Sequence, residues 1–148
     1  MKSSAMIAFH ADNTTPRITK NGPQWVWVFE SNLAGRHGAG AAKVARVNFG
    51  AEYGVTSGQT GKSYAIPTKD KSLNTLEVDA IKPYIDGFLA YASSHPKLRF
   101  FVTRIGCGLA GYKDEEIGPL FAQAPENCSI PEQWQAFIVS QAREPAAA

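Results

Sequence analysis

The sequence has few of the features that would tie it to a metal, a membrane or an oxidising compartment. Only two cysteines, Cys107 and Cys128, occur in 148 residues, and their wide spacing fits neither a zinc site nor a disulfide framework. No apolar run approaches the roughly 18 residues of a membrane helix, and the short apolar stretch at residues 5–9 suits a strand rather than a signal peptide. We therefore expect a cytoplasmic protein with reduced thiols and with no metal or cofactor.

Excess charge is also lacking. Fifteen Lys and Arg residues face thirteen Asp and Glu residues, and the net charge of +2 is too balanced to argue for a nucleic acid or a membrane as partner. A phosphate-bearing small molecule still fits, because backbone N–H groups hold phosphate without net protein charge. No repeat or linker divides the chain, so we expect one domain over residues 1–148, with 143–148 as a frayed tail.

The apolar segments predict strands that alternate with helices. The predicted strands are 5–10, 24–30, 63–68, 99–105 and 127–130. The predicted helices are 41–49, a segment from Asp79 as N-cap to about His95, 114–124 and 134–142, and the glycine-rich segment 50–62 is predicted to be an irregular loop. This order predicts an α/β fold of three α/β/α layers with a mostly parallel sheet.

Two glycine-rich segments, Asn32–Gly40 and Gly106–Tyr112, each follow a predicted strand and precede a predicted helix. Ligands bind beyond the carboxyl ends of parallel strands, and helix N-termini favour anions, so the two loops could hold a diphosphate from both sides. The alternative is that the glycines only form tight turns, but two equivalent loops favour an anion site. The candidate ligand-binding residues in the loops are Gly35, Arg36, Gly38, Ala39, Gly40, Gly106, Cys107, Gly108, Leu109, Ala110, Gly111 and Tyr112, the last placed to stack on a ribose or a base.

With the segments SNLAGRHGAGAA, SYAIPTKD and IGCGLAGY, residues 24–121 resemble the macro domain family, and most closely a phage-type branch of macro-like proteins. The resemblance implies a macro-type fold that binds ADP-ribose or a related nucleotide. Some members hydrolyse an ADP-ribosyl bond or the terminal phosphate of ADP-ribose phosphate. By position, Asn32 resembles the asparagine that faces the distal ribose, and 106–112 resemble the diphosphate loop. The usual triple glycine is replaced by RHGAG at 36–40, and Asp12 is the nearest match to the acidic residue that reads adenine.

Three side chains are candidates for catalysis: Asn32 to orient the ribose, and His37 and Asp70 to assist proton transfer from an activated water without a metal. His37 could equally pack within its loop, and a turn cap is the slightly favoured alternative for Asp70. A non-catalytic nucleotide sensor or a sequestering, anti-defence protein fits the same residues. An interaction protein on a macro-like scaffold is the alternative from another class.

Three further patterns are weaker. Cys107 has no neighbouring base, so small-residue packing is the better interpretation of it. Arg104 could pair with phosphate or with a nearby carboxylate. The segment 58–63 is similar to a P-loop, but Thr56 stands where the motif needs glycine and a strand follows instead of a helix, so we reject that interpretation.

Overall fold

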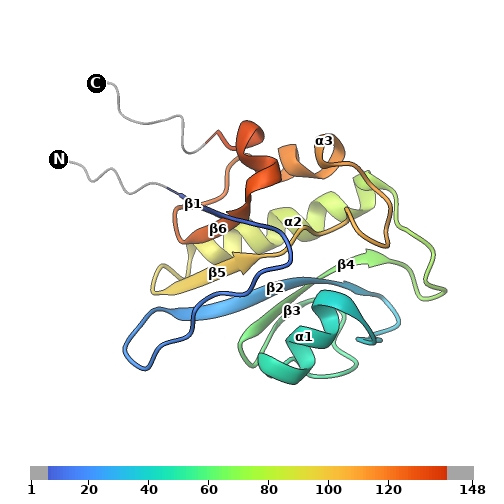
Figure 1. The fold of residues 1–148 in the computed structure, drawn as a ribbon. Coiled ribbons are helices and arrows are strands. Elements are labelled where there is room, and N and C mark those ends of the chain that lie inside the picture. The colour runs from blue at the N-terminus through green and yellow to red at the C-terminus, as the bar shows by residue number, and fades with distance from the viewer. Residues whose placement is uncertain (1–6, 140–148) are drawn as a thin grey trace.

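In a computed structural model that describes residues 7–139, the chain forms a six-stranded sheet flanked by helices (Figure 1). The strand order is β1-β6-β5-β2-β4-β3, and every neighbouring pair is parallel except β3 and β4. The strands are β1 (Ala8–His10), β2 (Gln24–Asn32), β3 (Gly58–Thr60), β4 (Ser63–Lys69), β5 (Leu98–Val102) and β6 (Cys128–Pro131). The predicted α/β class with a mostly parallel sheet is confirmed.

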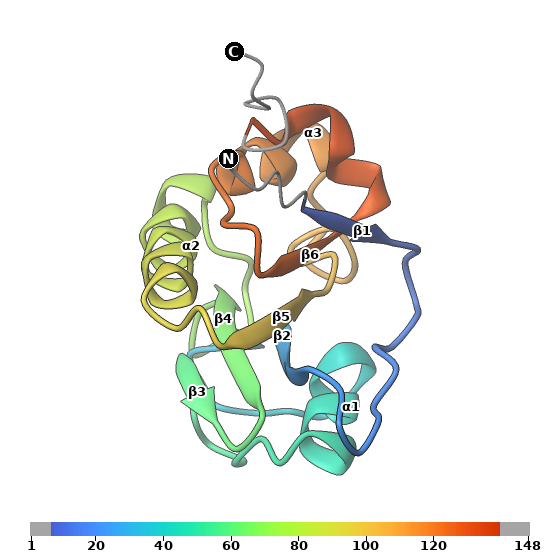
Figure 2. The same cartoon turned by 90° about the vertical axis from the view of Figure 1, so that its left-hand side faces the viewer.

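The central strand β2 is buried on both faces, as its continuous apolar sequence predicts. Val26 and Val28 belong to one core cluster, and Trp27 and Phe29 belong to another, because successive side chains point to opposite faces. The first cluster takes Ile81, Ile85, Phe88 and Ala92 from helix α2 (Val78–Ser93), and the second takes Ala45 from helix α1 (Gly40–Asn48). Figure 2 shows the sheet between these two helices.

The ends of several elements differ from their predicted bounds. Helix α2 begins after Glu77, so Asp79 is not the N-cap but lies in the first turn, where its charge still complements the helix dipole. Pro83 consequently lies inside the helix and removes one internal hydrogen bond. Predicted loop 50–62 contains β3, which pairs antiparallel with β4 across a turn at Gly61, where φ is +57°.

The predicted helix at 114–124 is shorter and changes type. It consists of α3 (Asp114–Ile117) followed by a 3₁₀ turn, η1 (Gly118–Phe121), because Pro119 cannot donate a backbone hydrogen bond. A second 3₁₀ segment, η2 (Glu132–Phe137), replaces the predicted helix at 134–142, and residues 140–148 lie outside the described residues. Within residues 7–139, no helix combines the length and the apolar character needed to cross a membrane.

The sheet has a topological switch point between β2 and β5. The chain leaves β2 through α1 toward β4 on one side, whereas it leaves the adjacent β5 through α3 toward β6 on the other side. Because the two connections diverge, a crevice forms at the carboxyl ends of these strands, and such crevices are where open α/β sheets bind ligands.

Candidate functional site

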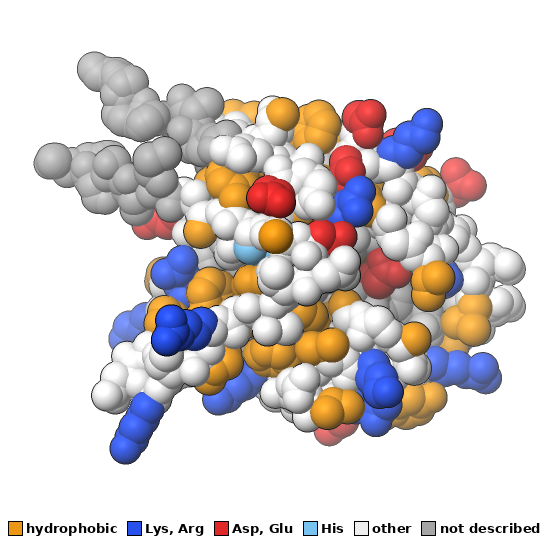
Figure 3. All heavy atoms as spheres, viewed as in Figure 1, with side chains coloured by type: hydrophobic (Ala, Val, Ile, Leu, Met, Phe, Trp, Pro, Cys, Tyr) orange, Lys and Arg blue, Asp and Glu red, His pale blue; other side chains and the backbone are white. Residues whose placement is uncertain are grey.

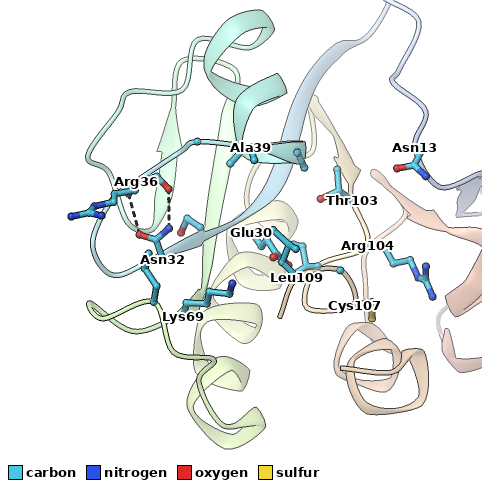
Figure 4. Close-up of a pocket in the computed structure, with 18 of the residues that line it drawn as sticks. Asn13, Glu30, Asn32, Arg36, Ala39, Lys69, Thr103, Arg104, Cys107 and Leu109 are labelled. Atoms are coloured by element: carbon cyan, nitrogen blue, oxygen red, sulfur yellow. Dashed lines mark hydrogen bonds between the residues drawn. The ribbon is translucent and has the colours of Figure 1, made fainter. Parts of the chain in front are cut away.

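A cavity of about 470 Å³ lies at the carboxyl ends of β2, β4 and β5. Figure 3 shows a recess on this face, and Figure 4 shows the side chains that surround the cavity. Residues from four separate segments of the chain line it: Asp12, Asn13, Glu30, Ser31, Asn32, Arg36, Gly38, Ala39, Gly40, Ala41, Ala42, Lys69, Leu73, Thr103, Arg104, Ile105, Cys107, Gly108 and Leu109. The two glycine-rich loops therefore meet at one cavity.

Only part of the predicted site lies there. The predicted residues that line the cavity are Asp12, Asn32, Arg36, Gly38, Ala39, Gly40, Cys107, Gly108 and Leu109. Those that do not are Gly35, His37, Asp70, Gly106, Ala110, Gly111 and Tyr112. Most of the predicted residues that do not line the cavity instead stabilise the conformation of the loops through their own contacts.

In the second loop, several backbone N–H groups are already paired. The Gly106 N–H donates to Glu30 Oε1 at 2.6 Å, and the Gly111 and Tyr112 N–H groups donate back to carbonyls of the same loop at 3.0 and 2.8 Å. Within residues 7–139, the N–H groups of Gly108, Leu109 and Ala110, which lie between these paired groups, have no acceptor. Gly108 and Leu109 line the cavity, so their N–H groups are available to an anion there.

The first loop ends at a helix N-terminus that is also free. Within residues 7–139, no side chain caps α1, its first turn carries no acidic residue, and the first backbone bond runs from the Lys43 N–H to the Ala39 carbonyl at 3.2 Å. The N–H groups of Gly40, Ala41 and Ala42 consequently have no acceptor in the described part of the chain. Because all three residues line the cavity, the positive end of the α1 dipole faces it.

Asn32 shapes the first loop with its side chain. Its Oδ1 accepts from the Ala34 N–H at 3.1 Å and the Arg36 N–H at 3.0 Å, while its Nδ2 donates to the Arg36 carbonyl at 2.8 Å. Figure 4 shows two of these bonds as dashed lines, with the Arg36 guanidinium pointing away from the other labelled residues. Asn32 lines the cavity, but only one amide hydrogen remains for a ligand.

His37 lies beneath its loop rather than in the cavity. The side chain is 1% exposed, and its ring makes edge contacts with Phe29 and Tyr53. Its Nε2 lies 2.9 Å from the Val55 carbonyl, so Nε2 carries the hydrogen and donates it, and the buried Nδ1 has no partner among residues 7–139. This is the packing role that the sequence offered as the alternative to proton transfer.

Asp70 and Tyr112 also have structural partners. Asp70 Oδ1 accepts from the N–H groups of Ser72 and Asn74, each at 2.9 Å, which makes it the cap of a tight turn. The Tyr112 hydroxyl donates to the Leu76 carbonyl at 2.5 Å, and its ring packs against the α2-side core. The expectation that Tyr112 is free to stack on a ribose or base is therefore not supported by its position.

Arg104 and Cys107 lie at the base of the second loop. Arg104 donates to both oxygens of Asp114 at 2.8 and 2.6 Å and reaches Asp12 at 3.3 Å, so it satisfies carboxylates, one of the two roles considered for it. Burial, together with the Asp114 carboxylate, raises the pKa of the Cys107 thiol to about 12. A thiol in this state is a poor nucleophile at neutral pH.

Sequence reasoning missed Glu30 and Lys69, which line the cavity at the ends of β2 and β4. Burial raises the pKa of the Glu30 carboxyl, against the lowering effects of the Gly106 N–H and the Lys69 charge. A signal was present: Glu30 is the first charged residue after the apolar run 25–29, and Lys69 directly follows the buried segment 63–68. Both positions mark where a strand leaves the core at the ligand-binding edge.

Comparison with known proteins adds no assignment: no protein-family model, no curated protein and no solved structure matches the chain.

Proposed function

We propose that the protein binds ADP-ribose or a related ADP-ribose-derived nucleotide in this cavity, on a three-layer scaffold of macro type. One observation carries the proposal. Two glycine-rich loops that are far apart in the sequence line the same cavity at the switch point of the sheet, and the N–H groups of 40–42 and of 108–109, all residues of its lining, have no acceptor within residues 7–139. Paired sets of backbone donors suit a diphosphate.

The size and charge of the cavity fit this ligand class. A volume of about 470 Å³ lies in the range of about 300–1,000 Å³ that small-molecule sites occupy. Lys69 and Arg36 line it without an ion pair among residues 7–139, whereas the third cation, Arg104, is neutralised by Asp12 and Asp114. Lys69 and the backbone donors complement a diphosphate without a strongly basic surface, and Figure 3 shows basic and acidic side chains both present on this face.

Recognition is the first step of the proposal, and hydrolysis is secondary to it. His37 and Asp70, the residues predicted to assist proton transfer, do not line the cavity, so they do not support turnover. Cys107, predicted to pack rather than to react, is held as a thiol. Hydrolysis of an ADP-ribosyl or phosphate bond would have to draw on Glu30 or Lys69 instead. A sensor or a sequestering protein needs only the binding site.

Calorimetric titration with ADP-ribose, with AMP and NAD as comparison ligands, tests the proposal. We expect micromolar binding of ADP-ribose and no measurable binding of AMP, which lacks the diphosphate. Absence of binding and of a thermal shift with all three would contradict the proposal and favour an interaction protein on this scaffold.

Glycine variants make the test specific to the loops. A Cβ added at Gly38 or Gly108 meets no atom within 4 Å, and neither residue has positive φ, so Gly38→Ala and Gly108→Ala should fold normally. Each methyl group would occupy space that the ligand needs, and we expect at least a tenfold loss of ADP-ribose affinity. Gly87→Ala, on the exposed face of α2 with the same open surroundings, is the matched control and should bind as the unmodified protein does.

A further inference from the structure

Glu30 is a fixed carboxylate between the two loops. It lies near the end of the central strand β2, its Oε1 accepts from the Gly106 N–H at 2.6 Å, and its other oxygen has no hydrogen-bond partner among residues 7–139. Figure 4 shows Glu30 between the two loops, with the Lys69 side chain extending toward it. One oxygen is therefore held by the protein while the other is left to whatever fills the cavity.

The charged and titratable groups around Glu30 come from every segment that lines the cavity: Lys69 from β4, Arg36 from the first loop, Asp12 from the N-terminal segment, and Arg104 and Cys107 from the second loop. Arg104 is paired with both Asp114 and Asp12, so it leaves no uncompensated positive charge, and Cys107 is protonated at neutral pH. Lys69 is the cation whose charge acts on Glu30. Within residues 7–139, Glu30 is thus hydrogen-bonded to the protein through one oxygen only.

This arrangement restricts which part of a ligand can touch Glu30. An ionised carboxylate repels a phosphate at short range, and it accepts hydrogen bonds but donates none. A diphosphate held by the N–H groups of 40–42 and 108–109 must therefore turn a neutral donor toward Glu30. In a nucleotide, the neutral donors within one sugar's reach of the diphosphate are ribose hydroxyls.

We propose that the free oxygen of Glu30 accepts a hydrogen bond from a ribose hydroxyl next to the diphosphate, and so makes the site select ribose-bearing diphosphates over bare diphosphate. The inference rests on the proposed function. Both riboses of ADP-ribose offer this chemistry, one on the adenosine side and one at the distal end, and the ligands below distinguish them.

The test compares the unmodified protein with Glu30→Gln by calorimetry at pH 7.5, using ADP-ribose, ADP and inorganic pyrophosphate. Gln keeps an oxygen for the Gly106 N–H, so the loop should stay in place, and equal melting temperatures check this. We expect ADP-ribose affinity to fall at least tenfold and pyrophosphate affinity to stay equal or rise, because a negative charge has gone. Glu126→Gln, an exposed carboxylate outside the cavity, is the charge-matched control.

The ADP result identifies the ribose. An equal loss with ADP assigns the contact to the adenosine ribose, and an unchanged ADP affinity assigns it to the distal ribose. A loss with ADP that disappears with inosine diphosphate would assign Glu30 to the adenine amine and overturn the proposal. Equal losses for ADP-ribose and pyrophosphate would also overturn it, since Glu30 would then only position the second loop.

A pH series adds a readout that a structural role would not move. The ADP-ribose affinity of the unmodified protein should fall as pH is lowered through the pKa of Glu30, which burial raises above its ordinary value, and Glu30→Gln should lack that step. If the unmodified protein binds ADP-ribose and Glu30→Gln binds it equally, the inference fails alone. If the unmodified protein binds none of the nucleotides, the proposed function fails and the inference with it.

Discussion

At the scale of single residues, buried polar groups in this protein have their ionisation set by where the fold places them. His10 is an example away from the cavity. Its ring stacks on Phe101 with centroids 3.8 Å apart, and its nitrogens lie 2.7 Å from Ser129 Oγ and 2.9 Å from the Val102 carbonyl. Burial lowers its pKa from 6.5 to about 4, against the raising effects of the Val102 carbonyl and Asp12.

His10 therefore predicts a loss of stability in acid. Between pH 6.5 and about 4 the unfolded chain binds a proton at His10 that the folded chain does not, so the free energy of unfolding falls as pH falls through this window. Allowing for solvent screening of a partly exposed ring, the loss attributable to His10 is roughly 1–2 kcal/mol. Urea unfolding of the unmodified protein and of His10→Gln at pH 7 and 4.5 measures it, and an equal pH dependence in both would contradict the prediction.

Cys107 predicts low thiol reactivity. With its pKa at about 12, and with Cys128 fully buried and also at about 12, neither cysteine should react readily with a disulfide reagent in the native protein at pH 7.5. We expect labelling at least tenfold slower than that of free cysteine, and rapid labelling of both thiols in guanidinium. A Cys107→Ser protein shows which thiol accounts for any residual reaction, and rapid native labelling of Cys107 would contradict its assignment as a packed thiol.

At the scale of elements, the position of the site depends on the connections between strands and helices. Asn127, which is 8% exposed, directs its Nδ2 toward the carbonyls of Ala92, His95 and Leu98 at 3.0–3.1 Å. These carbonyls belong to the end of α2, to the connecting segment and to the start of β5, so one amide group hydrogen-bonds to all three parts of the connection. The same connection sets where β5 begins and thus where the second loop emerges.

Asn127→Ala should leave those carbonyls without their donor in a buried setting. We expect a loss of about 1–3 kcal/mol in the free energy of unfolding. Asn127→Asp should cost more, because it points a carboxylate at the same carbonyl oxygens. Chemical denaturation of both variants checks the order, and an Asp variant as stable as the unmodified protein would show that the connection does not depend on this donor.

At the scale of the whole molecule, a ligand that bridges the two loops should stabilise the fold. The loops leave adjacent strands toward opposite sides of the sheet, and the bond from the Gly106 N–H to Glu30 ties the second loop to the end of β2. A ligand that binds the folded state alone adds about 2.7 kcal/mol at one hundred times its dissociation constant. Differential scanning fluorimetry should show the melting temperature rising with ADP-ribose concentration, and Gly108→Ala should require at least ten times more ligand for the same shift.

Much of this molecule followed from the sequence alone. Continuous apolar strands such as 24–30 require burial on both faces, and the alternation of such strands with helices implies a mostly parallel sheet. Glycine at 35–40 and 106–111 predicted loops where backbone approaches backbone: Gly35 and Gly106 have positive φ, and the Gly54 N–H donates to the Gly35 carbonyl at 2.9 Å. These features are local, so local sequence is enough to encode them.

Tertiary structure alone decided which residues of those loops face the cavity. His37 and Asp70 have side chains suited to proton transfer and follow predicted strands. In the fold, however, His37 Nε2–H donates to the Val55 carbonyl, and Asp70 Oδ1 accepts from the N–H groups of the turn at 72–74. Glu30 and Lys69 had no motif around them, and they meet because β2 and β4 are neighbours in the sheet. Side-chain partners across the fold set the availability and the ionisation of each group, and no spacing along the chain records them.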